Sequence, residues 1–76
     1  MPTIRGIVLP AEWDDKGNIK NILISTPNEE EYFITSNEKS EILMDFLRQE
    51  VEVVGQVKEN NFQKSITIQK YSVKQR

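Results

Sequence analysis

The last third of the chain alternates between apolar and polar residues, and this period of two constrains the fold more than any other feature. In residues 51–58 the valines fall mainly on one face, and in residues 64–73 Ile66 and Ile68 alternate with polar side chains. Alternation in β-branched residues is typical of half-buried antiparallel strands. The polar segment 59–62 between them contains two asparagines, which tolerate the positive φ of a tight turn. The sequence therefore predicts a C-terminal β-hairpin.

A longer first strand is expected over residues 4–13. Its apolar pattern does not keep one phase, and Gly6 marks a point where a strand bends sharply or passes close to another backbone. Pro10 cannot donate a ladder hydrogen bond, so we expect it at a bulge or on an edge. A long, bent opening strand fits a small barrel better than a flat sheet.

Two shorter strands are expected over residues 19–25 and 32–35. Both faces of the first are apolar, which indicates a central strand or a partly covered second face. In the second, Tyr32 and Ile34 share a face, and Phe33 points the other way.

The periodicity changes to a helical one after residue 35. Ser36 or Asn37 is suited to cap a helix, and the acidic residues of the next turn are favoured there by the helix dipole. An apolar stripe then predicts one buried face on a helix of about three turns. The stripe consists of Ile42, Leu43, Phe46 and Leu47.

The last strand changes its apolar phase, from Ile66 and Ile68 to Tyr71 and Val73. Keeping both pairs inside a barrel requires a bulge near residues 69–70, and bulges are common where barrels curl. Alternatively, the second pair covers the outside of the sheet.

The predicted order is strand, strand, strand, helix, strand, strand, in a single domain over residues 1–76. This order resembles the OB-fold, an all-β class with one helix whose five strands form an antiparallel Greek-key barrel. Gly6, the stripe within 42–47 and the strand pair 51–57 and 66–68 carry the resemblance. An SH3-like barrel competes, but it normally lacks so substantial a helix before the fourth strand.

The residue types present argue against catalysis. Cysteine and histidine are both absent, which removes disulfides, thiolate metal sites and the commonest general base. No nucleophile–base grouping and no phosphate-binding glycine loop is visible. The acidic stretches 14–15 and 29–31 do not have the spacing of an EF-hand loop, so solvated turns are the favoured interpretation. We expect a non-enzymatic protein without cofactor or metal.

The lengths of the apolar segments bear on the expected cellular location. No apolar stretch approaches the roughly 20 residues that cross a bilayer, and no basic segment followed by an apolar run appears near the start. We therefore expect a soluble, cytoplasmic domain without a membrane partner.

Charge is distributed unevenly although the net charge is only −2. Residues 1–50 carry five basic and ten acidic groups, whereas residues 51–76 carry five basic and two acidic groups. A basic hairpin can mark a nucleic-acid surface, but solubility demands a similar number of charges.

The resemblance implies a ligand site across the second and third strands, between the loops 14–18 and 59–63. Aromatic side chains near these loops are candidate stacking platforms, with either Tyr32 or Phe33 on the face between. The competing interpretations are a lid role for Trp13 and packing of Phe62 across its own hairpin. The candidate binding residues are Trp13, Lys20, Tyr32, Phe62, Lys58, Lys64 and Lys70.

Glu12, Asp14 and Asp15 border one wall of this site and residues 29–31 form the acidic turn beyond it. These carboxylates oppose phosphate binding, so the expected partner is a protein rather than a single-stranded nucleic acid. Contact would use the groove or an exposed strand edge. The alternative is a weak single-stranded nucleic-acid binder, in which Phe62 and Trp13 stack on bases and the lysines contact phosphates. A homodimer formed through an edge strand is a third hypothesis, because so small a core gains from association.

Overall fold

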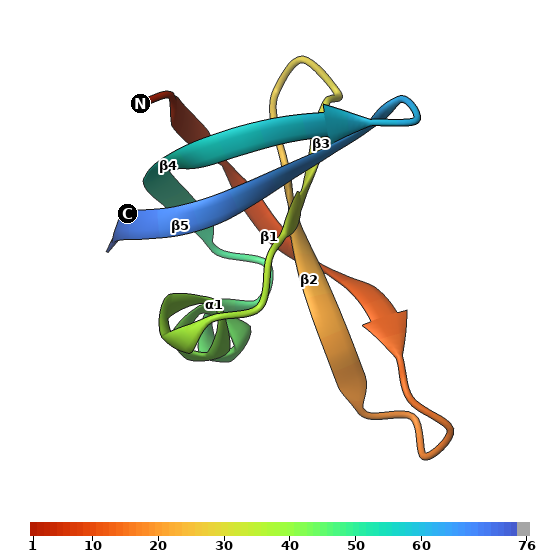
Figure 1. The fold of residues 1–76 in the computed structure, drawn as a ribbon. Helices are drawn as coiled ribbons and strands as arrows, with labels where there is room; N and C mark the ends of the chain where they lie inside the picture. Colours follow the sequence, from red (N-terminus) through yellow and green to blue (C-terminus); the bar gives the residue numbers. More distant parts are fainter. Residues whose placement is uncertain (75–76) are drawn as a thin grey trace.

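The protein, described here from a computed structural model over residues 1–74, is a mostly-β chain whose five strands close into a barrel (Figure 1). This confirms the predicted fold class. Arg76, one of the basic residues counted above, lies outside the described residues. The elements are β1 (Thr3–Trp13), β2 (Ile19–Ser25), β3 (Glu31–Ile34), α1 (Glu38–Leu43), a 3₁₀ turn (Met44–Phe46), β4 (Glu50–Asn60) and β5 (Gln63–Val73). Around the barrel the strands follow the order β1-β2-β3-β5-β4.

Strand β1 pairs with two neighbouring strands, which explains its length. Its first half pairs with β4 and its second half with β2, and the exchange occurs near Ile7. A β-carbon at Gly6 would overlap the carbonyl oxygen of Ser25, so this glycine permits the close approach that was expected. The register shifts between Pro10 and Glu12, so the proline lies beside a bulge, as expected.

The C-terminal hairpin contains the predicted bulge. Val54 pairs with Lys70 and Gly55 with Ile68, which leaves Gln69 without an opposite residue. The apolar residues beyond the bulge therefore return to the inner face, where they pack against the core.

The barrel closes through a parallel pairing of β3 with β5, whereas the other four pairings are antiparallel. Tyr32 is opposite Lys64 and Phe33 is opposite Ser65. This seam departs from the all-antiparallel expectation because a helix, rather than a hairpin, connects β3 to the final strand pair.

The core lies inside the barrel and is formed by side chains from all five strands and from α1. Its members are Val8, Ile22, Ile24, Tyr32, Ile34, Leu43, Val51, Val53, Ile66 and Ile68. Within residues 1–74, no buried side-chain nitrogen or oxygen lacks a hydrogen-bond partner. The same residues contain no helix that is long and apolar enough to span a membrane.

Asn37 anchors the helix to the barrel. Its Oδ1 accepts hydrogen bonds of 2.9 Å from the backbone N–H groups of Lys39 and Ser40, which caps α1 as predicted. Its Nδ2 donates to the carbonyl oxygen of Ile68 at 3.1 Å. One side chain therefore links the start of the helix to β5.

The buried face of the helix differs from the predicted one. Ser40 and Leu43 are buried, whereas Ile42 is 43 % exposed. The fixed start of α1 directs positions three residues apart toward the barrel and turns Ile42 away, because each helical residue rotates by about 100°. Phe46 and Leu47 do pack against the core, but they do so after the chain has tightened into the 3₁₀ turn.

The corrected helix face predicts unequal costs for two neighbouring truncations. Leu43→Ala should lower the free energy of unfolding by about 2–5 kcal/mol, because it leaves a cavity in the core. Ile42→Ala should cost less than about 1 kcal/mol, because that side chain stays partly in water. Urea unfolding of both variants measures the difference, and equal costs would contradict the assigned helix face.

Candidate functional site

An apolar strip crosses the outside of the barrel over β1, β2 and β3. Leu9 pairs with Leu23, and Leu23 pairs with Phe33, so the three side chains follow one another across the sheet. Leu23 is only 6 % exposed although it points away from the inward-facing Ile22 and Ile24. Its neighbours cover it. We call Leu9, Leu23 and Phe33 the outer strip.

Two recesses border the outer strip, and together we call them the groove. One has a volume of about 520 Å³ and the other of about 460 Å³. Phe33 and Gln63 line both and therefore separate them. The first is also lined by Glu29, Glu30, Glu31, Phe62 and Lys64, and the second by Ala11, Glu12 and Asn21.

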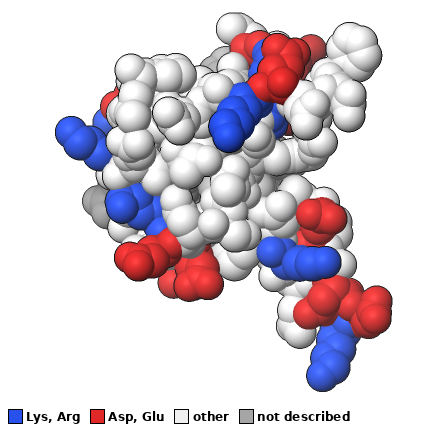
Figure 2. Space-filling view, viewed as in Figure 1, with Lys and Arg blue, Asp and Glu red and all other residues white. Residues whose placement is uncertain are grey.

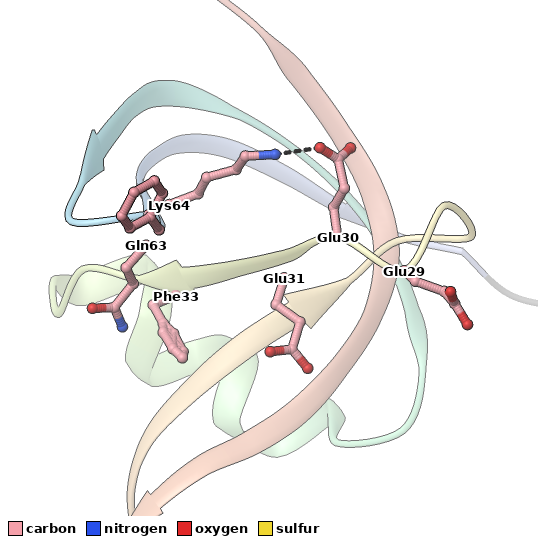
Figure 3. Close-up of a pocket in the computed structure, with 7 residues that line it drawn as sticks. Glu29, Glu30, Glu31, Phe33, Gln63 and Lys64 are labelled. Atoms are coloured by element: carbon pink, nitrogen blue, oxygen red, sulfur yellow. Dashed lines mark hydrogen bonds and ion pairs between the residues drawn. The ribbon is translucent and has the colours of Figure 1, made fainter.

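Alternation along the strands decides which side chains face the groove. Figure 3 shows Gln63, Phe33 and Glu31 pointing to the same side of β3. Lys64 and Glu30 meet on the other side, and Glu29 is directed away. The outward row therefore presents an amide, an aromatic ring and a carboxylate next to one another.

Phe62 is fully exposed at the tip of the β4–β5 hairpin. Asn61 and Phe62 have φ values of 52° and 65°, so both central residues of this two-residue turn are left-handed. The turn was expected to use the two asparagines, but Asn60 instead stays in the strand opposite Gln63. A bulky residue in this conformation costs on the order of 1 kcal/mol or more, and here the ring gains no burial in return.

Lys64 is held by an ion pair rather than left free. Its ammonium donates to the Glu30 carboxylate and lies 5.4 Å from the centre of the Tyr32 ring. The hydrogen bond that Lys64 donates to Glu30 raises the pKa of Lys64 above its usual value. The charge of Lys64 is therefore offset by Glu30 and adds little positive potential to the groove.

Tyr32 was predicted as a binding residue, but it does not face the groove. It is 9 % exposed and its ring belongs to the core, so it presents no face for stacking. Phe33 is the β3 aromatic that lines the groove, because the parallel seam sets Tyr32 inward and Phe33 outward.

The remaining predicted site residues are distributed over different parts of the surface. Trp13, on the β1–β2 hairpin, is 57 % exposed. Lys20 nearby is also exposed, but neither residue lines the two recesses. Lys58 is opposite Ser65, which is itself opposite Phe33, so its position continues the row of the outer strip.

Lys70 does not belong to the groove. It pairs with Val54, which in turn pairs with Thr3 near the start of β1. This row lies beyond the Gln69 bulge, about six residues along β5 from Lys64, which corresponds to about 20 Å. The structure therefore does not bring the predicted lysines together into one basic surface.

Acidic side chains dominate the groove. Four glutamates and one lysine line it, but Glu30 pairs with Lys64 on the other side of β3 and Glu29 is directed away (Figure 3). Glu12 and Glu31 therefore supply the carboxylates that face it. Among the described residues, the recorded ion pairs do not involve Glu12 or Glu31. Figure 2 shows this side of the molecule indented between the two projecting hairpins, with charges of both signs on each.

The acidic turn between β1 and β2 has a structural role. Asp14 Oδ1 accepts hydrogen bonds of 2.9 Å from the backbone N–H groups of Lys16 and Asn18. These bonds, the one from Asn18 foremost, lower the pKa of Asp14. Within residues 1–74, no group of three acidic side chains is close enough together to hold a metal ion.

Sequence reasoning missed Glu31, Gln63 and the leucines of the outer strip. The alternation of Glu31 with Phe33 was a usable signal, because it places both on one face of β3. Gln63 gave no comparable signal, because its direction depends on where the hairpin turn falls. No family model, curated protein or solved structure matches this chain, so the function has to be argued from the groove itself.

The strained turn predicts that Phe62→Gly stabilises the protein. Glycine adopts positive φ without strain, and the lost ring was fully exposed, so the free energy of unfolding should rise by about 1 kcal/mol. Asn61→Gly is the matched control and should change it by less than about 0.5 kcal/mol, because asparagine tolerates this conformation. Urea unfolding measures both, and a clear loss of stability in Phe62→Gly would contradict the prediction.

Proposed function

We propose that this chain is a non-enzymatic OB-fold binding module that contacts another protein through the groove. Support for the fold assignment comes from the closed five-strand barrel and from the helix between β3 and β4, which the OB-fold shares. In that fold the face of the second and third strands, between two loops, receives ligands. The groove occupies the corresponding face.

Phe62 is the observation that carries this proposal. Its ring is fully exposed and its backbone is strained, so folding alone gives no reason for an aromatic side chain at this position. Aromatic residues are the side chains that most often anchor one protein on another. Phe62 projects beside Phe33 and the apolar outer strip, which together offer the apolar centre of a contact surface.

The charge of the groove favours a protein over a nucleic acid. Phosphates would approach Glu12 and Glu31, which repel them, and Lys64 is paired with Glu30. The exposed rings of Phe62 and Trp13 are the observation that favours the alternative, weak single-stranded nucleic-acid binding by stacking. Of the lysines expected to contact phosphates, Lys58 has the most suitable register.

Two further expectations stay predictions. Residues 56–60 of β4 extend beyond β1 and pair with β5, so their other edge is available for a homodimer or for β-augmentation. Lys58 and Glu59 place charges there, which disfavours pairing between edges. A cytoplasmic location also stays a prediction.

A photocrosslinking experiment tests the proposed contact. Benzoylphenylalanine in place of Phe62, introduced into the protein in its host cells, should yield adducts that proteases destroy and nucleases leave intact. The same probe in place of Ile42 is the matched control, because Ile42 is exposed but lies on the helix, away from the groove.

Protein adducts at position 62 in clear excess over position 42 are expected. Nuclease-sensitive adducts at position 62 would favour the nucleic-acid alternative. Equal labelling at the two positions would contradict a role for the groove.

A further inference from the structure

We propose that the occupant of the groove is an extended peptide segment with two basic side chains four residues apart and an apolar residue midway between them. This inference rests on the proposed function and specifies the partner's chemistry. It follows from the positions of two carboxylates relative to Phe33. Each recess contains one of them, Glu31 on one side of the ring and Glu12 on the other.

The strand register gives the separation of the two carboxylates along the direction of β2. Along β2, Asn21 pairs with Glu12, Leu23 with Phe33 and Ser25 with Glu31. The row of Glu12 and the row of Glu31 are therefore four residues apart, which is about 13 Å along β2 at about 3.3 Å per residue. Glu12 is on β1 and Glu31 on β3, so the two residues are also two strand spacings, or about 10 Å, apart across the sheet.

Glu12 belongs to the same face as Asn21, because its Oε1 accepts a hydrogen bond of 3.4 Å from the Asn21 side-chain amide. The outer strip crosses β2 midway between the two rows, at Leu23.

An extended peptide has the matching period. Its residues i, i+2 and i+4 point to one side, and the outer two are about 13 Å apart. With the middle residue over Phe33 and Leu23, the outer two lie level with the rows of Glu12 and Glu31. Each outer side chain then has to cross one strand spacing, about 5 Å, to reach its carboxylate, which a long side chain can do. Apolar contact in the centre and opposite charges at both ends are then satisfied together.

Arginine fits the two ends better than a simple ammonium ion. The planar guanidinium can pair with a carboxylate through two N–H groups and stack on an aromatic face. The recess that contains Glu31 also contains Phe62 and Phe33, so both contacts are available to one side chain. Lys64 does not repel the incoming cation strongly, because Glu30 offsets its charge.

The test uses two labelled peptides of identical composition. In Gly-Ser-Arg-Ser-Leu-Ser-Arg-Ser-Gly the arginines have the proposed spacing, and in Gly-Ser-Ser-Arg-Leu-Arg-Ser-Ser-Gly they are two residues apart. At low salt the first peptide should bind at least about fivefold more tightly than the second. It should also shift the amide signals of Phe33, Gln63 and Asn21 in NMR spectra. Replacing both arginines by citrulline should abolish binding, and added salt should weaken it.

Three variants of the protein test which carboxylates contact the peptide. Glu12→Gln and Glu31→Gln should each weaken binding of the first peptide by about fivefold. Glu41→Gln, an exposed carboxylate on α1 outside the groove, should change it by less than about twofold.

The possible failures are distinguishable. Equal affinity for the two spacings, or an effect of Glu41→Gln equal to those of the groove variants, would overturn the inference and leave the groove as a contact surface. If an oligothymidylate shifts the groove amides and the arginine peptides do not, the inferred partner and the proposed protein ligand are both wrong. If no probe shifts these amides at millimolar concentration, the inference is wrong, and position 62 crosslinking separately decides the proposed function.

Discussion

The short parallel seam between β3 and β5 is the constraint on which the rest of the structure depends. It closes the barrel through the pairings Tyr32–Lys64, Phe33–Ser65 and Ile34–Ile66. Side chains alternate along a strand, so a slip of one residue would exchange the two faces of β3. Tyr32 would then leave the core and Phe33 would leave the groove. The register of this seam therefore decides both what the barrel buries and what it presents to a partner.

Three contacts outside the seam hold that register. The backbone N–H of Thr35 donates to the Ile66 carbonyl at 2.9 Å, which extends the pairing past the end of β3. Asn37 then ties the start of the helix to the Ile68 carbonyl, and on the other side Lys64 bridges to Glu30 above the Tyr32 ring. The same ion pair offsets the one basic charge in the lining of the groove. Fold and proposed function therefore share the contact between Lys64 and Glu30.

The parts of the fold that local periodicity determines were predictable from the sequence, and the parts that depend on distant contacts were not. The five strands followed from alternation. The apolar phase shift on β5 allowed either a bulge or an outward-facing second pair, and the structure has the bulge at Gln69. The exposure of Ile42 did not follow, because a hydrogen bond to β5 sets the rotation of the helix. The choice between Tyr32 and Phe33 likewise needed the seam register, and the strain at Phe62 needed the pairing of Asn60 with Gln63.

The most direct measurement of the central claim is an NMR experiment on the β3–β5 seam. The closed barrel predicts nuclear Overhauser contacts between backbone protons of Phe33 and Ser65, and hydrogen exchange at the Thr35 amide as slow as in the β4–β5 hairpin. It also predicts contacts from the Tyr32 ring to the core methyl groups and none from the Phe33 ring. Rapid exchange at Thr35, or Phe33 in contact with the core, would contradict the closure of the barrel and the groove built on it.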